Sequence, residues 1–454
     1  MQDLTTGPIS RHLLRTTSFM LVAMAFQTLY FLVDLYWVGR LGREAVAGVG
    51  IAGNLTFIVL AITQMLGVGI TTLVSHAVGQ KDQGRALLVF NQSLLLSLLV
   101  ALAFLAFGMA VRVPYVNALA ADSLTGQLAG DYLLWFIPAM ALQFGMVSMG
   151  AALRGTGNFK PGMVVQAATV ILNLVLAPAL IFGWGIAPRM GVAGAAIASL
   201  VAIAVGILWL SCYFVGPGAY LTFMRDDWKP DTVLWRKILG IGLPAGAEFA
   251  LVAVYLFVVY VVSRPFGAAA QAGFGIGMRL IQAGFMPVVA LGFAVAPVAG
   301  QNFGARQPQR VRDTFTTAAA MAAGVMVLWS VVCLTRGAAM VRIFSADAQV
   351  IAVGAEYLGI VSWTFAASGV IYVGSSMFQA MGNTLPALMA SLIRIVIVAI
   401  PAFVLSRLPG FELRWIWYLS ALAVTLQLGL NLILLKREFR VRLNFVDAER
   451  VRLS

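Results

Sequence analysis

The sequence predicts an all-α polytopic membrane protein of about twelve transmembrane helices in two pseudo-symmetric lobes of six. Three observations support this prediction: an apolar composition, the distribution of the basic residues and an internal repeat. Apolar residues make up 61% of the chain and charged residues 10%, against about 45–50% and about 25% in soluble domains. Runs of about 20 apolar residues, the length that crosses a bilayer, follow one another almost from end to end.

These runs place the individual spans and divide the chain. The most polar interior stretch covers residues 223–237, in the middle of the chain, and is typical of a loop between two halves. We therefore expect a first lobe at 1–215, a cytoplasmic linker at 216–236, a second lobe at 237–436 and a cytoplasmic tail at 437–454. The expected spans are 14–38, 50–76, 88–111, 130–152, 163–183, 192–214, 237–262, 272–298, 312–334, 351–379, 385–405 and 414–435.

The basic residues orient the chain in the membrane. The chain has 30 Lys and Arg residues. If the amino terminus is cytoplasmic, 19 of them lie on the cytoplasmic side and 9 on the outer side, and the other two, Arg279 and Arg394, lie within spans. The positive-inside rule then predicts that both termini are cytoplasmic. The net charge of +13 thus belongs to the loops and does not indicate a nucleic-acid partner. The first apolar run lacks an A-x-A-like cleavage site, so we interpret it as a retained helix.

The two halves of the chain resemble each other. Residues 41–55 and 266–280 share seven of fifteen positions at a shift of 225. The same shift pairs the Gly-Asn-x-x-Pro sequence at Gly157 with that at Gly382. Composition alone would not align these residues, so the sequence indicates a duplication.

One further match suggests an insertion or deletion between the halves. A change of four residues in the offset pairs Gly79-Gln80 with Gly300-Gln301. Each half has an even number of expected spans, so the two halves have the same orientation. Secondary transporters use parallel repeats of this kind for alternating access.

Six segments are specific in their order and spacing along the chain: VDLYWVGRLG (33–42), LVSHAVGQKDQGRA (73–86), ALRGTGNFKP (152–161), the stretch 173–199, IGLPAGAE (241–248) and APVAGQNFGAR (296–306). Through these segments the chain resembles a known family, the multidrug and toxic compound extrusion (MATE) exporters, over residues 14–435. The resemblance implies a V-shaped fold and export of bulky, often cationic amphiphiles against inward flow of H⁺ or Na⁺. We expect a monomer in a bacterial inner membrane that acts on small amphiphilic molecules and needs no cofactor.

Asp34 is the strongest candidate for the coupling residue. It lies within the first span, and Gln27 and Tyr30 precede it by seven and four residues, so the three share one helix face. Apart from Arg15 at the cytoplasmic end of the first span, the first half has no Lys or Arg inside an expected span. Because charge is costly inside a bilayer, an unpaired acid there is suited to taking up and releasing a proton. The family resemblance points to the same position; the alternative is a solvated aspartate at the rim.

Further polar residues of the first half have compatible spacing. Gln166, Thr169 and Asn173 fall on one face of the fifth span. Asn173 and Ser199 match positions that help to form a cation site in a DinF-like, sodium-binding branch of the family. That branch carries an acid where this chain has Ala177, so we favour H⁺ over Na⁺. The alternative for Asn173 is a role in helix packing.

The second half contains a different set of charges. Glu248 lies within the seventh span, and Arg279 and Arg394 lie in the same half. An ion pair, or a network through Gln282, would stabilise Glu248, so a structural role and a coupling role both remain open. Family members often carry further acids in this half that are absent here. As substrate or cavity residues we name Gln27, Tyr30, Gln166, Thr169, Arg279, Gln282, Ser368, Tyr372 and Arg394.

Two other functions make different demands on the residues within the spans. A flippase for a lipid-linked saccharide, from a related superfamily, would line its cavity with several cationic residues, and only Arg279 and Arg394 are available within spans. A membrane-embedded enzyme would need paired acids, a histidine cluster or a nucleophile–base set within the spans. The chain has two histidines and two cysteines and no GxxxxGK[ST] sequence, so it predicts neither a metal centre nor direct use of ATP.

Overall fold

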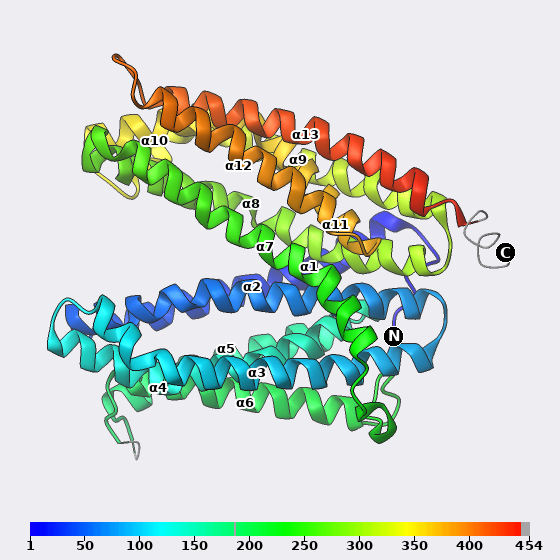
Figure 1. The fold of residues 1–454 in the computed structure, drawn as a ribbon. Coiled ribbons are helices and arrows are strands. Elements are labelled where there is room, and N and C mark those ends of the chain that lie inside the picture. Colours follow the sequence, from blue (N-terminus) through cyan, green and yellow to red (C-terminus); the bar gives the residue numbers. More distant parts are fainter. Residues whose placement is uncertain (186–187, 446–454) are drawn as a thin grey trace. The chain divides into compact units, whose positions relative to one another are not determined.

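The chain folds into long helices joined by short loops (Figure 1). The computed structural model describes residues 1–185 and 188–445, and that part of the chain contains no strand. Three short 3₁₀-helices are η1 (Arg225–Trp228), η2 (Arg264–Phe266) and η3 (Ser362–Thr364). The α-helices are α1 (Ile9–Gly39), α2 (Arg43–Gly79), α3 (Gln83–Leu119), α4 (Ser123–Gly155), α5 (Lys160–Phe182), α6 (Val192–Val215), α7 (Thr232–Ser263), α8 (Gly267–Gly304), α9 (Pro308–Arg342), α10 (Ala348–Val361), α11 (Phe365–Ala380), α12 (Leu385–Leu405) and α13 (Arg414–Arg442).

The prediction of about twelve spans is confirmed. Eleven helical stretches of the described chain are long and apolar enough to cross a membrane. One of them, Thr232–Gly304, has 73 residues, about 110 Å of helix at about 1.5 Å per residue, against a hydrocarbon layer of about 30 Å. It contains α7 and α8 with η2 between them, so it supplies two spans and raises the number to twelve.

The tenth span is broken, where a single helix at 351–379 was expected. It consists of α10 and α11 with η3 between them. The hydroxyl of Thr364 donates to the carbonyl of Val361 (2.8 Å), and that of Ser330 in α9 donates to the carbonyl of Ser362 (2.7 Å). Serine and threonine hydroxyls compete in this way with the regular helix ladder, which accounts for the interruption.

The helices group into two compact units. The first consists of residues 1–3 and 18–246, and the second of residues 4–17 and 247–454. Both divisions fall inside helices, in α1 after Thr17 and in α7 after Gly246. The boundaries therefore differ from the expected linker at 216–236, since α7 already begins at Thr232 and its first half belongs to the first unit. In the expected tail, α13 continues to Arg442, and residues 446–454 lie outside the described residues.

Close helix packing explains why the first half of α7 belongs to the first unit. A Cβ added at Gly242 would lie 1.9 Å from the carbonyl oxygen of Met65 in α2, and one at Gly246 would lie 2.6 Å from that of Ala61. A Cβ at Gly69 of α2 would in turn meet the carbonyl oxygen of Ile238 at 2.4 Å. Glycine removes the side chains that would hold the two backbones apart.

The linker before α7 is fixed to α3. The side chains of Asn91 and Gln92 are fully buried, and both ends of each amide bond to linker backbone. These bonds leave the linker little freedom of its own. The linker groups that they hold are the carbonyls of Thr222, Asp227 and Lys229 and the N–H groups of Met224 and Asp231.

From the start of α3 to the start of α5, and from the start of α9 to the start of α12, the backbone repeats at a shift of 225 without insertion or deletion. Helices α3, α4 and α5 begin at 83, 123 and 160, and α9, α10 and α12 begin at 308, 348 and 385. The turn after α2 has Lys81 at φ 58°, and the turn after α8 has Arg306, its counterpart, at φ 54°. The same bonds close both turns. The expected pairing of Gly79-Gln80 with Gly300-Gln301 is therefore wrong, because the turn geometry aligns Gly79 with Gly304.

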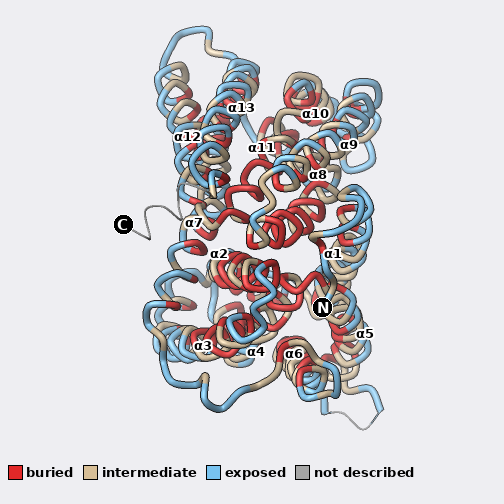
Figure 2. The backbone as a smooth tube through the Cα atoms, turned by 90° about the vertical axis from the view of Figure 1, so that its right-hand side faces the viewer, coloured by how far each residue is buried: buried red, intermediate tan, exposed pale blue. Residues whose placement is uncertain are grey.

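Each unit has a buried core of its own (Figure 2). In the first unit the core includes Phe90, Phe144 and Phe214. In the second unit one cluster includes Phe365 and Phe378 together with Leu4 and Leu13, and another stacks Phe274, Tyr357 and Trp417. Leu13 belongs to the first half of α1, which explains why residues 4–17 group with the second unit.

Candidate functional site

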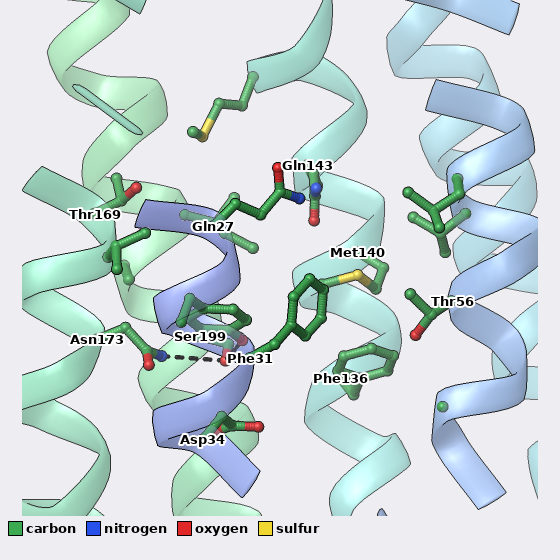
Figure 3. A pocket seen from close by; sticks show the side chains of 18 of the residues that line it. Gln27, Phe31, Asp34, Thr56, Phe136, Met140, Gln143, Thr169, Asn173 and Ser199 are labelled. Carbon is green, nitrogen blue, oxygen red and sulfur yellow. Dashed lines mark hydrogen bonds between the residues drawn. The ribbon is translucent and has the colours of Figure 1, made fainter. Parts of the chain in front are cut away.

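A cavity of about 200 Å³ lies within the first unit. Its wall is formed by side chains of α1, α2, α4, α5 and α6 (Figure 3). All seven residues that the sequence singles out in the first half contribute to this wall, although they come from three helices. They are Gln27, Tyr30 and Asp34 of α1, Gln166, Thr169 and Asn173 of α5, and Ser199 of α6.

Asp34 is the acid of this cavity. It lies on the same face of α1 as Gln27 and Tyr30, as the spacing predicts (Figure 3 shows Gln27 and Asp34). Its Oδ1 atom is buried and has no hydrogen-bond partner among the described residues. An unpartnered carboxylate oxygen in a buried site favours binding of a proton or of a donor that reaches it.

A short chain of hydrogen bonds joins α1, α6 and α5 next to Asp34. The hydroxyls of Tyr30 and Ser199 lie 2.7 Å apart, and the amide of Asn173 donates to the Ser199 hydroxyl at 3.2 Å. Asn173 and Ser199 are buried, and Figure 3 shows the bond between them. These hydrogen bonds hold the part of α1 that carries Asp34 against α6 and α5.

Three amide side chains of the cavity have no such partner. Gln27 and Gln166 were named from the sequence, and Gln143 of α4 joins them. Among the described residues none of the three amides makes a hydrogen bond to the protein. Figure 3 labels Gln27 and Gln143 among the side chains that line the cavity.

Part of the cavity wall is largely apolar. Tyr132, Phe136 and Met140 of α4 and Phe31 of α1 contribute to it. The rings of Tyr132 and Phe136 are stacked, with centroids 5.1 Å apart and an interplanar angle of 27°. This face of α4 is absent from the site predicted above. The spacing of Tyr132, Phe136, Met140 and Gln143 at four, four and three residues is a helix-face signal that could have indicated it.

The second unit contains a buried polar network around Glu248. The hydroxyls of Ser375 and Ser391 donate to Oε1 of Glu248 at 3.3 and 2.9 Å, and Gln427 donates to the Ser391 hydroxyl at 3.2 Å. Three helices, α7, α11 and α12, thus meet at one carboxylate. In the described part of the chain Glu248 forms no ion pair, so the expected ion pair is corrected to a hydroxyl network.

Neither Arg279 nor Arg394 forms an ion pair with the Glu248 carboxylate in the described structure. Arg394 lies over the ring of Tyr255, with its Cζ atom 5.9 Å from the ring centroid, and within electrostatic range of Glu248. Arg279 and Gln282 are exposed, and no hydrogen bond joins Gln282 to Glu248 in the described structure. Ser368 and Tyr372 lie on α11, half-buried, with the Tyr372 ring edge-on to Phe285.

Two repeats of one six-helix backbone plan, with a cavity that contains an acid in one of them, are typical of a membrane transporter. The MatE family model matches residues 20–179 and 244–404, two segments whose ends lie 225 residues apart (404 − 179). Because these matches cover more than half of the chain, the chain belongs to the MatE family of multidrug exporters. The family consists of transporters and not enzymes, as the sequence predicts.

Curated relatives and solved structures agree with this assignment. The FAD transporter of Shewanella oneidensis is 26% identical over 399 residues, 88% of each chain. The multidrug export protein MepA of Staphylococcus haemolyticus is 25% identical over 395 residues, 86% of each chain. The structure of a MOP superfamily transporter from Pyrococcus furiosus has a TM-score of 0.87 over 97% of this chain and 98% of that chain at 22% identity, which is evidence for the fold.

Proposed function

We propose that the chain exports amphiphilic, often cationic organic compounds in exchange for protons that move inward, with Asp34 as the proton carrier. The observation that carries this proposal is the buried, unpartnered Oδ1 atom of Asp34 on the wall of the cavity. The exporter acts as a monomer in a bacterial inner membrane with both termini in the cytoplasm. One charge moving down 100 mV supplies about 2.3 kcal/mol, enough for a gradient of about 50-fold.

The coupling step follows from the surroundings of Asp34. The ionised carboxylate can only accept hydrogen bonds, whereas the protonated acid also donates one. Protonation therefore removes a charge from the cavity and changes what the cavity can hold. Because Tyr30 is fixed through Ser199 to Asn173, this change acts on a section of α1 that is already held in place.

The donor set favours a proton over a sodium ion. A sodium site needs several oxygen ligands, and Asp34 is the acid that this cavity offers. The side-chain nitrogen of Asn173 is committed to Ser199, and Ala177 stands where the sodium-binding branch carries an acid. Sodium remains the alternative ion. Glu248 remains the second candidate for coupling, with its two serine hydroxyls as a competing structural explanation.

A second candidate substrate class comes from one of the relatives. The Shewanella oneidensis relative is named an FAD transporter, so flavin nucleotides are candidate cargo for this chain as well. Arg279 and Arg394 lie within spans and supply cationic groups that an anionic cargo could use. Export of flavin nucleotides would use the same two-unit fold and the same proton carrier.

The test measures transport of ethidium, a permanent cation, by purified protein in liposomes. The membrane potential is clamped, and proton and sodium gradients are imposed separately on the wild type, Asp34→Asn and Asp131→Asn. Asp131 is an exposed acid of α4 away from the cavity and serves as the matched control. We expect an acid lumen alone to drive uptake by the wild type and Asp131→Asn, and at least 100-fold slower uptake by Asp34→Asn.

Other outcomes would redirect the proposal. Uptake that requires the sodium gradient would contradict the choice of the proton. Equal proton-driven uptake by Asp34→Asn and Asp131→Asn would remove Asp34 from the mechanism. No uptake under either gradient would favour flavin nucleotide export or the lipid-linked saccharide flippase, which the same liposomes can test with those cargoes.

A further inference from the structure

The three unpartnered amides of the first-unit cavity differ from the buried amides that hold two parts of the backbone together. Asn91 and Gln92 use both ends of their amides on the linker, and Asn302 donates to the carbonyls of Leu4 and Val298 while it accepts from Arg310. In contrast, Gln27, Gln143 and Gln166 line the cavity without a hydrogen bond to the described protein. Their hydrogen-bonding capacity is free for a ligand.

The chemistry of an amide restricts which ligand can use it. Each glutamine offers two N–H donors and one carbonyl acceptor, so the cavity presents donors and acceptors in comparable number. An ammonium group would use the carbonyl oxygens alone and leave the NH₂ groups unpaired. A phosphate would use the NH₂ groups alone and would be repelled by the Asp34 carboxylate. A ligand with a donor beside an acceptor satisfies both ends of each amide.

The size and the walls of the cavity restrict the shape of the ligand. At about 200 Å³ the cavity is smaller than the roughly 300–1,000 Å³ of sites for whole drug-sized molecules, so it admits about one ring system. The stacked rings of Tyr132 and Phe136 and the thioether of Met140 give the α4 side of the cavity an apolar surface. Such a surface accepts the face of a flat ring through stacking and sulfur contacts.

We propose that this cavity binds a planar heteroaromatic ring whose edge carries an N–H group beside a carbonyl, such as the imide edge of an isoalloxazine. Glutamine pairs with an edge of this kind through two parallel hydrogen bonds, as it does with adenine in nucleic acids. The ring face lies against the α4 wall, and its imide edge meets the amides of Gln27 and Gln143. The inference rests on the proposed export function, since it names the cargo group that the exporter recognises in this cavity.

The test uses riboflavin, which carries the imide edge and no phosphate, and measures its binding to the full-length protein in lipid nanodiscs by flavin fluorescence. The matched ligand is N3-methylriboflavin, whose imide N–H is blocked. The matched variants are Gln143→Met and Gln127→Met, the latter at an exposed position of the same helix. Methionine has about the length of glutamine and lacks its hydrogen-bonding groups.

We expect saturable binding of riboflavin by the wild type and by Gln127→Met. The dissociation constant should rise about tenfold for N3-methylriboflavin, and likewise for riboflavin with Gln143→Met or Gln27→Met. Equal affinity for the two flavins, or unchanged affinity in both cavity variants, would overturn the proposal. The ligand comparison needs only wild-type protein, so a variant that fails to fold does not affect it.

The design separates this inference from the proposed export function. Riboflavin binding is measured at equilibrium without any gradient, so it can succeed where proton-driven transport of ethidium fails. Transport that depends on Asp34, combined with equal binding of the two flavins, would retain the proton exporter and reject the imide-edged ring. Binding that discriminates the flavins, combined with transport that does not need Asp34, would reject the coupling residue and retain the ring.

Discussion

The two units share one backbone plan, but their counterpart positions carry different chemistry. In the first unit Asp34 lines a cavity, whereas its counterpart at a shift of 225, Val259, is a fully buried apolar residue. In the second unit the acid is Glu248, whose counterpart in the first unit is Ala23. The acids of the two units therefore occupy different places in the repeat and have different surroundings.

Three positions that border the cavity in the first unit carry larger side chains in the second. Gly53 corresponds to Met278, and Ala202 corresponds to Gln427, which belongs to the network around Glu248. Thr169 corresponds to Arg394. The tyrosines persist, since Tyr30 and Tyr132 correspond to Tyr255 and Tyr357.

The repeated backbone features have a common physical cause. Asp122 and Asp347, which correspond at the shift of 225, both cap the next helix by accepting bonds from its first N–H groups. Such caps satisfy backbone groups that have no partner within the helix. This requirement is the same in both units and does not depend on their function. We infer that duplication retained the features that backbone geometry requires and that the polar side chains diverged into a site in one unit and a scaffold in the other.

The largest effect is expected where α7 contacts α2 in the first unit. In Gly242→Ala the new Cβ would overlap the Met65 carbonyl oxygen, which a backbone cannot easily avoid. Overpacking of this kind costs about 1–3 kcal/mol, and more against backbone, so we expect a loss of about 3 kcal/mol or more in thermal unfolding. Gly240→Ala, where a Cβ meets nothing within 4 Å, is the control and should be near neutral.

The equivalent position in the second unit provides a further variant for comparison. Thr17 is the counterpart of Gly242 (242 − 225) and packs in the second unit with its side chain in place. Because the surroundings of the buried Thr17 already accommodate a side chain, Thr17→Ala should lower the free energy of unfolding less than Gly242→Ala. A similar loss of stability in Gly240→Ala and Gly242→Ala would contradict the close approach of α7 to α2.

Hydropathy predicted the spans because the bilayer demands about 20 apolar residues for each crossing. It could not predict that the units divide after Gly246, because that depends on how closely Gly242 approaches α2. The turn after α2 was misaligned because Lys81 and Arg306 adopt positive φ without the glycine that signals such a turn.

The candidate site was predictable where all of its evidence lay on one helix. Gln27, Tyr30 and Asp34 share a face of α1 through their spacing alone, and the structure places all three on the cavity wall. Gln143 was missed because its importance depends on the rotation of α4 toward α1. The two hydroxyls that reach Glu248 come from α11 and α12, more than 100 residues away in the chain, so spacing could not indicate them.

An intermediate effect is expected from removing the acids. Glu248→Ala leaves the hydroxyls of Ser375 and Ser391 without their acceptor, and unsatisfied buried groups cost about 1–3 kcal/mol each. Asp34→Ala removes an oxygen that has no partner, so its unfolding free energy should change by less than about 0.5 kcal/mol. Unfolding in detergent checks both. Normal transport by Asp34→Asn together with lost transport in a folded Glu248→Gln would reverse the assigned roles.

The smallest effect is expected at the paired tyrosines, which tie the first helix of each repeat to its sixth. Tyr30 meets the Ser199 hydroxyl at 2.7 Å, and Tyr255 meets that of Ser420 at 3.2 Å. Removing either hydroxyl should cost about 0.5–1.5 kcal/mol, and Tyr30→Phe should cost more because its bond is shorter and lies within the chain to Asn173. In transport assays Tyr30→Phe should slow proton-driven uptake by several fold, while Tyr255→Phe leaves it unchanged. If Tyr255→Phe slowed uptake as much as Tyr30→Phe, the two units would share the coupling, and the separation of site from scaffold would fail.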